Sequence, residues 1–214
     1  MRMQVGDQII VCDGKGGCME GVIRSAKAKE GMLELTKDHS LAFRNPRAYK
    51  VSLGMAPTKS IDRTEFAIEK LIEIGVEEIA FLDCDHNERT YLRLDRLQKI
   101  SIAASKQSKK TVFPSLQDLV SAEDYVDRKS HLQNTQIFAC HLDEDNETLL
   151  KNYLPGHDVV LLIGPEGGFS SDEIETMKSQ NVKLINLGPF RLRVETAAIV
   201  ACAQIHFINQ MPKA

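Results

Sequence analysis

Two glycine-bearing loops near the C-terminus contain the residues best suited to binding a ligand. The first loop covers residues 163–170, with the sequence IGPEGGFS, and follows the apolar segment 159–163. Its three glycines expose backbone N–H and C=O groups, so a flat ligand could approach them closely. It matches neither GxxxxGKS/T nor GxGxxG, which makes a phosphate cradle a poor interpretation. A plain tight turn between a strand and a helix is the alternative.

The second loop covers residues 187–197 and reads LGPFRLRVETA. Arg191 and Arg193 precede a predicted helix, where guanidinium groups could hold an anion through paired hydrogen bonds. Glu195 falls in the first turn of that helix, and the helix dipole alone could explain a carboxylate there. Surface ion pairs between these arginines and Glu166 or Glu195 are the alternative interpretation.

The elements that position these loops form a predicted α/β domain over residues 54–214. The apolar run 159–163 is typical of a strand covered on both faces, as in a parallel sheet. In such sheets ligands bind at the carboxyl ends of the strands, where both loops lie. Strands are expected at 78–84, 136–142, 158–164 and 183–188, and helices at 62–75, 94–105, 144–153, 170–180 and 195–209, with capping boxes at Asp62 with Glu65 and at Ser170 with Glu173.

Residues 1–53 form a second predicted domain that is rich in β-structure. Short strands are expected at 8–12, 19–25 and 32–35, and Gly14, Gly16 and Gly17 favour a turn between the first two. Short strands separated by turns predict a small barrel or an open sheet.

Composition leaves several classes of function open. The net charge of −3 argues mildly against nucleic acid, yet residues 89–110 contain seven basic side chains against only Asp95. A solvated helix face is the alternative for this basic stretch. The five cysteines include no CxxC pair, which favours reduced thiols over a zinc site. The sequence shows no membrane span and no signal peptide, so a cytoplasmic location is expected.

Together the two loops resemble those of the SPOUT methyltransferases, and more narrowly the ribosomal RNA small subunit methyltransferase E family. Residues 163–170 match an IGPEGGFS-type loop, and residues 187–197 match an LG-x-x-x-LR-x-ETA-type loop. The resemblance covers about residues 5–208. Upstream matches are Lys59, Arg63, Lys70, Glu73, Gly75, Val76, Arg89, Gln107, Ser108 and Pro114.

The chain departs from the family pattern at several positions. Phe190 and Val194 stand where arginine and threonine are usual, and Arg191 could replace the missing arginine from the next position. Lys110 occupies an arginine position, which keeps the charge but loses the bidentate geometry. The family's N-terminus is longer, so the resemblance implies an incomplete PUA-like barrel with one or two leading strands absent.

The resemblance implies a parallel sheet with a C-terminal trefoil knot that binds S-adenosylmethionine and releases S-adenosylhomocysteine, without a metal. It also implies a homodimer built on the last helix, for which Ile199, Ile205 and Ile208 are candidates, although an ordinary core would suit them equally. The implied cofactor-binding residues are His141, Leu142, Ile163, Gly164, Pro165, Glu166, Gly167, Gly168, Leu187, Gly188 and Leu192.

The implied reaction is methylation of N3 of a uridine in 16S ribosomal RNA, within the small subunit or a late assembly particle. Arg193 or Arg191 could stabilise the uridine anion, and Glu195 or Glu166 could accept the N3 proton. The residues expected to bind RNA are Lys59, Arg63, Lys70, Arg89, Gln107 and Lys110.

Three other functions compete with this one. A SPOUT methyltransferase could act on transfer RNA or on a ribose 2′-hydroxyl group. A non-catalytic RNA-binding dimer could use the same fold, although the intact glycines of both loops argue against it. A nucleotide hydrolase is the third, and the chain lacks its phosphate loop.

Overall fold

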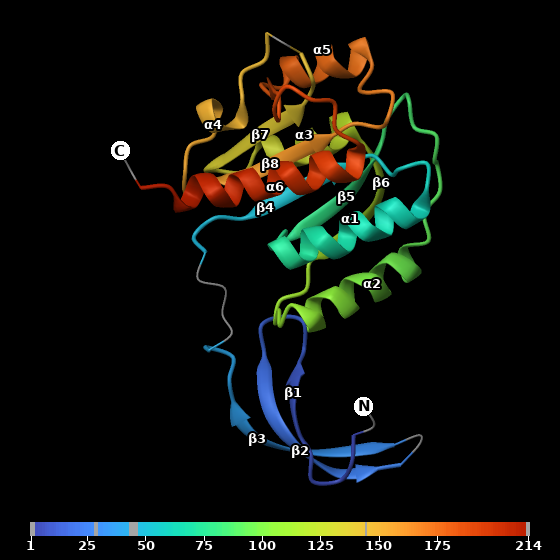
Figure 1. The fold of residues 1–214 in the computed structure, drawn as a ribbon, viewed down its shortest axis with the longest axis vertical. Coiled ribbons are helices and arrows are strands. Elements are labelled where there is room, and N and C mark those ends of the chain that lie inside the picture. The colour runs from blue at the N-terminus through green and yellow to red at the C-terminus, as the bar shows by residue number, and fades with distance from the viewer. Residues whose placement is uncertain (1–2, 28–29, 43–46, 144, 213–214) are drawn as a thin grey trace. The chain divides into compact units, whose positions relative to one another are not determined.

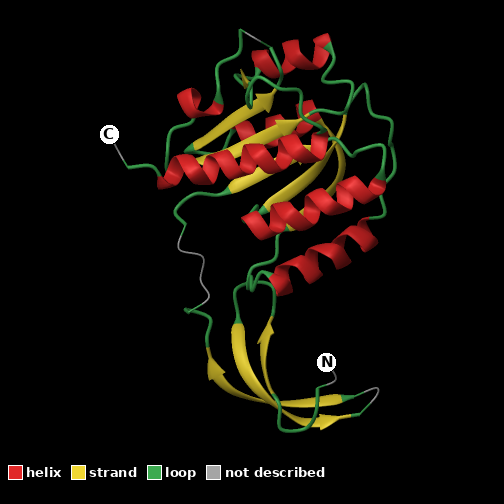
Figure 2. Cartoon of the chain, in the orientation of Figure 1, coloured by secondary structure: helices red, strands yellow, loops and turns green. Residues whose placement is uncertain are grey.

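The computed structural model describes residues 3–27, 30–42, 47–143 and 145–212, and contains two compact units (Figures 1 and 2). One unit comprises residues 1–46 and 105–113, and the other comprises residues 47–104 and 114–214. The expected boundary at residues 53 and 54 is therefore displaced, since it would cut through β4 (Val51–Met55), a strand of the second unit. Each unit is described by itself.

The N-terminal unit contains an antiparallel sheet in the order β1 (Gln8–Cys12), β2 (Cys18–Ala26) and β3 (Gly31–Asp38). This confirms the three expected strands. The turn between β1 and β2 is fixed by the Asp13 carboxylate, which accepts hydrogen bonds from the N–H groups of Lys15 at 2.7 Å and Gly17 at 2.9 Å.

The segment 105–113 pairs with this turn, which the sequence did not predict. The N–H of Gly16 donates to the Thr111 carbonyl at 3.0 Å, and the N–H of Phe113 donates to the Gly14 carbonyl at 2.9 Å. Residues placed by sequence in the α/β domain, Gln107 among them, therefore belong to the N-terminal unit.

The second unit is built on a six-stranded parallel sheet, as the apolar strand runs predicted. The strand order is β6-β5-β4-β8-β7-β9. Besides β4, the elements are α1 (Ile61–Ile74), β5 (Glu78–Asp83), α2 (Leu94–Gln107), β6 (Ser115–Ser121), α3 (Ala122–Ser130), β7 (Thr135–Cys140), α4 (Leu149–Asn152), β8 (Asp158–Ile163), α5 (Ser171–Ser179), β9 (Lys183–Ile185) and α6 (Val194–Gln210). The last three residues of α2, 105–107, belong to the N-terminal unit.

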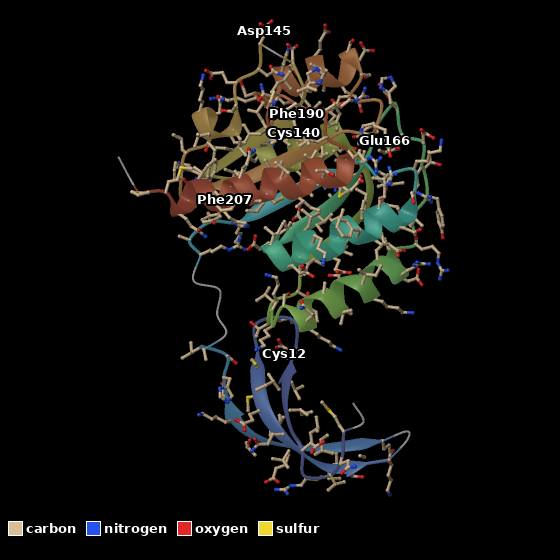
Figure 3. All side chains as sticks on the ribbon, in the orientation of Figure 1. Cys12, Cys140, Asp145, Glu166, Phe190 and Phe207 are labelled. Atoms are coloured by element: carbon tan, nitrogen blue, oxygen red, sulfur yellow. The ribbon has the colours of Figure 1, made fainter. Side chains whose placement is uncertain are left out.

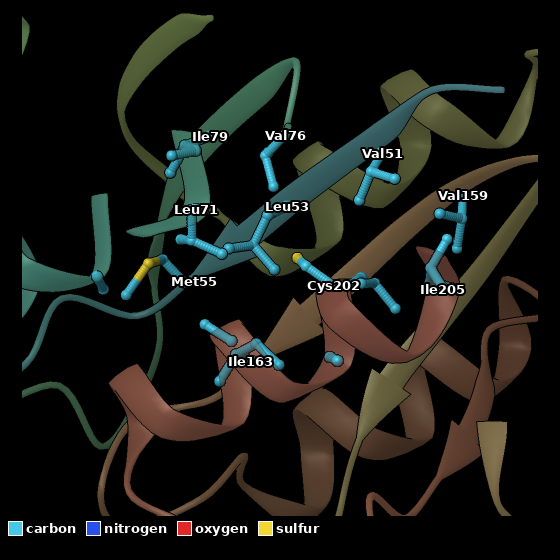
Figure 4. Close-up of a cluster of buried hydrophobic side chains, with 14 of the residues drawn as sticks. Val51, Leu53, Met55, Leu71, Val76, Ile79, Val159, Ile163, Cys202 and Ile205 are labelled. Carbon is cyan, nitrogen blue, oxygen red and sulfur yellow. The ribbon is translucent and has the colours of Figure 1, made fainter. Parts of the chain in front are cut away.

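Helices cover both faces of this sheet because its central strands are apolar on both sides. Val159, Leu161 and Ile163 of β8 join a core with α1, α2 and α6, part of which is shown in Figure 4. Val160 and Leu162 face the opposite way and pack with α3 and α5. Successive side chains of a strand point to opposite faces of the sheet, so a continuous apolar run contributes to one core on each face.

The capping box predicted at the start of α1 is wrong, and of the two interpretations of Ile205 and Ile208 in α6 the structure supports the ordinary core. Helix α1 begins after Ser60. Glu65 was expected to form a capping box with Asp62, but its carboxylate instead accepts a hydrogen bond from Arg96 at 2.8 Å. Ile205 and Ile208, candidates for a dimer face, are buried in the chain's own core. Among the described residues, no helix is long and apolar enough to cross a membrane.

Two elements near the candidate site are shorter than expected. Helix α4 spans only Leu149–Asn152, whereas residues 144–153 were expected to be helical, and Glu144 lies outside the described residues. The preceding residues form a loop because the carbonyls of Asn146 and Glu147 accept hydrogen bonds from Asn186 at 2.5 and 3.1 Å. Strand β9 ends at Ile185 rather than at residue 188.

Gly54 in β4 is required by close packing. A methyl group added there would lie 2.9 Å from the Tyr125 ring and 3.0 Å from Leu82. Gly54→Ala is expected to cost about 1–3 kcal/mol of folding free energy and to lower the melting temperature by several degrees. The control Gly31→Ala adds a methyl group 3.6 Å from the Ser25 carbonyl oxygen, an ordinary contact. Equal melting temperatures for the two variants in a calorimetric scan would contradict this.

Candidate functional site

A cavity of about 560 Å³ opens at the carboxyl ends of β7, β8 and β9. Cys140, Glu166 and Phe190, labelled in Figure 3, come from three different segments that meet there. The full lining is Cys140, His141, Leu142, Ile163, Gly164, Pro165, Glu166, Gly167, Gly168, Phe169, Leu187, Gly188, Phe190, Arg191, Leu192, Arg193, Val194 and Ala197.

The loop after β8 is a tight turn whose shape depends on glycine. The N–H of Gly168 donates to the Pro165 carbonyl at 2.8 Å, and Gly168 has a positive φ of 80°. A methyl group added at Gly164 would lie 3.1 Å from the Phe169 ring, which is tighter than most such contacts, so the ring would have to shift slightly. The Ser170 and Glu173 side chains then form the predicted capping box of α5.

The loop after β9 brings two arginines to the cavity. Gly188 has a φ of 132°, and nothing within 4 Å would meet a methyl group added there. Arg191 joins the two loops, because its Nη2 donates to the Glu166 carbonyl at 3.2 Å. Arg193 is exposed and stands at the N-cap of α6 without a side-chain cap bond.

The third segment, residues 140–142, is held beside the loop after β9. The N–H of His141 donates to the Ile185 carbonyl at 2.9 Å, and the His141 carbonyl accepts from Asn146 at 3.1 Å. Burial raises the pKa of the Cys140 thiol to about 12, so this thiol stays protonated near neutral pH and is a poor base.

The eleven residues expected to bind a cofactor all line this one cavity, and so do Arg191 and Arg193. Glu195 does not line it. That carboxylate is 9% exposed, and its Oε1 lies 3.9 Å from Arg63 Nε. Cys140 and Phe190 lie within the loops 140–142 and 187–192 that the resemblance implied around the cofactor. Sequence reasoning missed Phe169, Val194 and Ala197 as lining residues; all three adjoin predicted site residues or lie one helical turn from one.

The Glu166 side chain has two differently placed oxygens. Oε1 accepts a hydrogen bond from the N–H of Lys59 at 3.1 Å. Oε2 is shielded from solvent and has no hydrogen-bond partner within the described part of the chain. A carboxylate oxygen in this state is a strong acceptor for a donor that a ligand would bring.

The residues expected to bind RNA are divided between the two units. Lys59 is exposed and pairs with Glu88 at 2.6 Å, and Arg89 donates to the Thr58 and Lys59 carbonyls at 3.1 and 2.7 Å. Lys70 lies further along α1 and pairs with two glutamates of its own helix. Gln107 and Lys110 belong to the other unit.

Residues 45–206 match the model of the RNA methyltransferase domain family. The chain belongs to this RNA methyltransferase family. The recognised likeness to ribosomal RNA small subunit methyltransferase E is confirmed as well. The protein of that name from Rickettsia conorii is 31% identical over 162 residues, which cover 74% of this chain and 65% of the relative. The chain thus spans slightly less than two thirds of that relative's length.

Solved structures extend the likeness of this RNA methyltransferase family member to nearly the whole chain. A probable rRNA-methyltransferase from Porphyromonas gingivalis is 34% identical with a TM-score of 0.88, and the match covers 97% of this chain and 87% of that one. A structure from Legionella pneumophila, in complex with SAM, is 26% identical with a TM-score of 0.83, covering 96% and 85%. The expected SPOUT-like α/β fold with a parallel sheet is confirmed.

Proposed function

We propose that this chain transfers a methyl group from S-adenosylmethionine to N3 of a uridine in 16S ribosomal RNA. The observation that carries the proposal is the single cavity in which both glycine loops, residues 140–142 and two arginines meet. The similarity to ribosomal RNA small subunit methyltransferase E supports ribosomal RNA as the substrate. The N3 specificity rests on the family resemblance.

The cavity suits S-adenosylmethionine because its lining offers mostly backbone and apolar groups. Adenine is flat and carries hydrogen-bonding edges, which backbone N–H and C=O groups of Gly164–Gly168 and Leu187–Gly188 can meet. The Legionella pneumophila structure in complex with SAM supports this assignment. The bound cofactor supplies a sulfonium-activated methyl group, so the transfer needs no metal, and S-adenosylhomocysteine is the product.

The protein residues must orient the uridine and manage its N3 proton. Arg191 and Arg193 line the cavity, so their positive charge would stabilise the uridine anion as the proton leaves. Glu166 is the better placed proton acceptor, since it lines the cavity and its Oε2 has no partner among the described residues. Glu195 lies beside Arg63 outside the lining, where it would orient that arginine.

RNA binding in this proposal uses Lys59, Arg63 and Lys70 of the second unit, with Gln107 and Lys110 of the N-terminal unit. Lys59 is 74% exposed and Arg63 43% exposed in their side chains, as phosphate contacts require. Affinity for small-subunit RNA should fall with rising salt. We extend the proposal to a trefoil-knotted C-terminal segment, an incomplete PUA-like N-terminal barrel and assembly on the small ribosomal subunit, all from the resemblance.

We include a homodimer in the proposal. Its surface differs from the one formed by Ile199, Ile205 and Ile208 that the sequence suggested. Phe207 and Met211 at the end of α6 are 65% and 51% exposed, and Leu150 and Leu154 in and after α4 are 55% and 56% exposed. Exposed large apolar groups on adjoining elements favour burial against a second copy.

Phe207→Asp is therefore expected to convert the dimer to monomer, because it would place a charge in an apolar interface. Sedimentation velocity would measure the change, and Phe66→Asp on α1, 50% exposed, is the control. An unchanged dimer in the Phe207 variant would rule out this surface.

Two measurements test the proposed function. Calorimetry with S-adenosylmethionine should show one site per chain, and absence of binding heat would favour a non-catalytic RNA-binding protein. Mass analysis of nucleosides should show that 16S ribosomal RNA from cells without the protein lacks one N3-methyluridine that is present in RNA from cells with the protein. A lost ribose methyl group or a lost transfer RNA modification would instead reassign the substrate.

A further inference from the structure

The loop that connects β5 to α2 lies next to the cavity without lining it. Three of its residues, Asp85, His86 and Arg89, direct their polar groups at the two segments that flank Glu166. The sequence resemblance suggested RNA binding for Arg89, but the contacts of its guanidinium group indicate a different role.

Arg89 clamps the segment that precedes α1. Its Nε donates to the Thr58 carbonyl at 3.1 Å, and its Nη2 donates to the Lys59 carbonyl at 2.7 Å. Two charged hydrogen bonds to adjacent carbonyls fix the backbone more firmly than one could. Thr58 is fully buried, and its N–H donates a further hydrogen bond to Oγ1 of Thr64 in α1 at 3.0 Å.

The clamped segment in turn holds Glu166. The N–H of Lys59 donates to Oε1 of Glu166, and the exposed Lys59 ammonium group pairs with Glu88 of the same β5–α2 loop. With Oε1 engaged in this way, the other oxygen of Glu166 remains the acceptor without a partner among the described residues. The orientation of the Glu166 carboxylate therefore depends on where Arg89 places the Lys59 backbone.

The same loop supports the glycine turn from its other end. His86 Nδ1 lies 2.9 Å from the Gly168 carbonyl oxygen, so this ring nitrogen donates the hydrogen bond. A methyl group added at Gly167 would lie 3.1 Å from His86 Cβ, which shows how closely the turn rests on this side chain. Ser170 Oγ donates to Asp85 Oδ2 at 2.5 Å where α5 begins.

We infer that Arg89 is a positioning residue that orients Glu166 through the Lys59 backbone, and that the loop 85–89 fixes the cavity wall in one conformation. This inference rests on the proposed function for its catalytic consequence, while the hydrogen bonds it describes are independent of that function. The Thr58 and Lys59 carbonyls occupy two of the five N–H donors of the Arg89 guanidinium group, and these two bonds fix its orientation on the protein backbone.

Arg89→Lys and Arg89→Ala test this, because lysine keeps the charge but cannot donate to both carbonyls at once. Both variants should lower kcat on the order of 100-fold, since small misplacements of a reacting group have effects of that size, with KM for RNA unchanged. The slope of log affinity for RNA against log salt should equal that of the wild type. Arg93→Ala, which removes a 64% exposed arginine paired only with Asp95 in the described structure, should leave kcat unchanged.

Three results would overturn the inference. The first is a combination of two observations. Arg89→Lys would have the kcat of the wild type, and the slope of log affinity for RNA against log salt would be shallower in Arg89→Ala than in the wild type by about 0.7–0.9, the change expected when one phosphate contact is lost. Another is a lowered melting temperature with unchanged kcat in both variants, which would indicate a merely structural role. The third is unchanged hydrogen exchange at the Lys59 and Gly168 amides, whose protection should fall in Arg89→Ala.

The exchange measurement separates this inference from the proposed function. If the wild-type protein bound no S-adenosylmethionine, the proposed function would fail, yet faster exchange at Lys59 in Arg89→Ala would still support the positioning role. If the wild type methylated RNA and the variants did so equally well, only the inference about Arg89 would fail.

Discussion

Gly188→Val is expected to weaken binding of S-adenosylmethionine by about 10- to 100-fold, because forcing extra methyl groups into a close contact costs about 1–3 kcal/mol. Gly188 lines the cavity, and the open space where its Cβ would sit is the space assigned to the cofactor. Isothermal titration calorimetry would measure the change.

Gly156→Val provides a matched control for backbone strain. Gly156 also has a positive φ, 89°, and nothing within 4 Å would meet its added methyl group, but it does not line the cavity. Both variants should lose stability through the strained φ, by about 1–3 kcal/mol, and only Gly188→Val should lose cofactor affinity. Equal affinities of the two variants for S-adenosylmethionine would show that the cofactor does not contact the loop after β9.

Arg193→Ala is expected to lower the rate of methyl transfer by about 100- to 1000-fold, the usual effect of removing one donor that stabilises a developing anion. Arg193 is exposed and makes no side-chain bond to the start of α6, so the variant should fold normally. Single-turnover transfer of labelled methyl groups to small-subunit RNA would measure the rate, and the affinity for S-adenosylmethionine should stay near that of the wild type.

Arg24→Ala is the control for loss of a positive charge. Arg24 lies in β2 and pairs with Glu34 across the sheet, and both side chains are 54% exposed. This variant should transfer methyl groups at the wild-type rate. Full activity in Arg193→Ala would leave Arg191, which also lines the cavity, as the group that stabilises the anion.

Local sequence patterns predicted the sheet and both glycine loops well. The apolar run in β8 implied a strand covered on both faces, and Ser170 with Glu173 implied the capping box that starts α5. Such features depend on residues within a few positions of one another, so a single sequence contains the necessary information. Patterns near the ends of elements were less informative. Helix α4 is shorter than predicted because the residues that precede it form a loop, in which the Asn146 carbonyl accepts a hydrogen bond from the Asn186 side chain.

By itself, then, the sequence determined a parallel α/β sheet with two ligand-accessible turns at its carboxyl edge, and the family resemblance added His141 and Leu142 to them. Only the tertiary structure decided that Glu195 lies outside the cavity, that the segment 105–113 pairs with the β1–β2 turn, and that Arg89 bonds backbone carbonyls beside Glu166. The last two outcomes depend on hydrogen bonds between residues that lie 30 to 107 positions apart in the chain. A backbone carbonyl is present at every residue, so the amino-acid types give no sign of which one a distant arginine will reach.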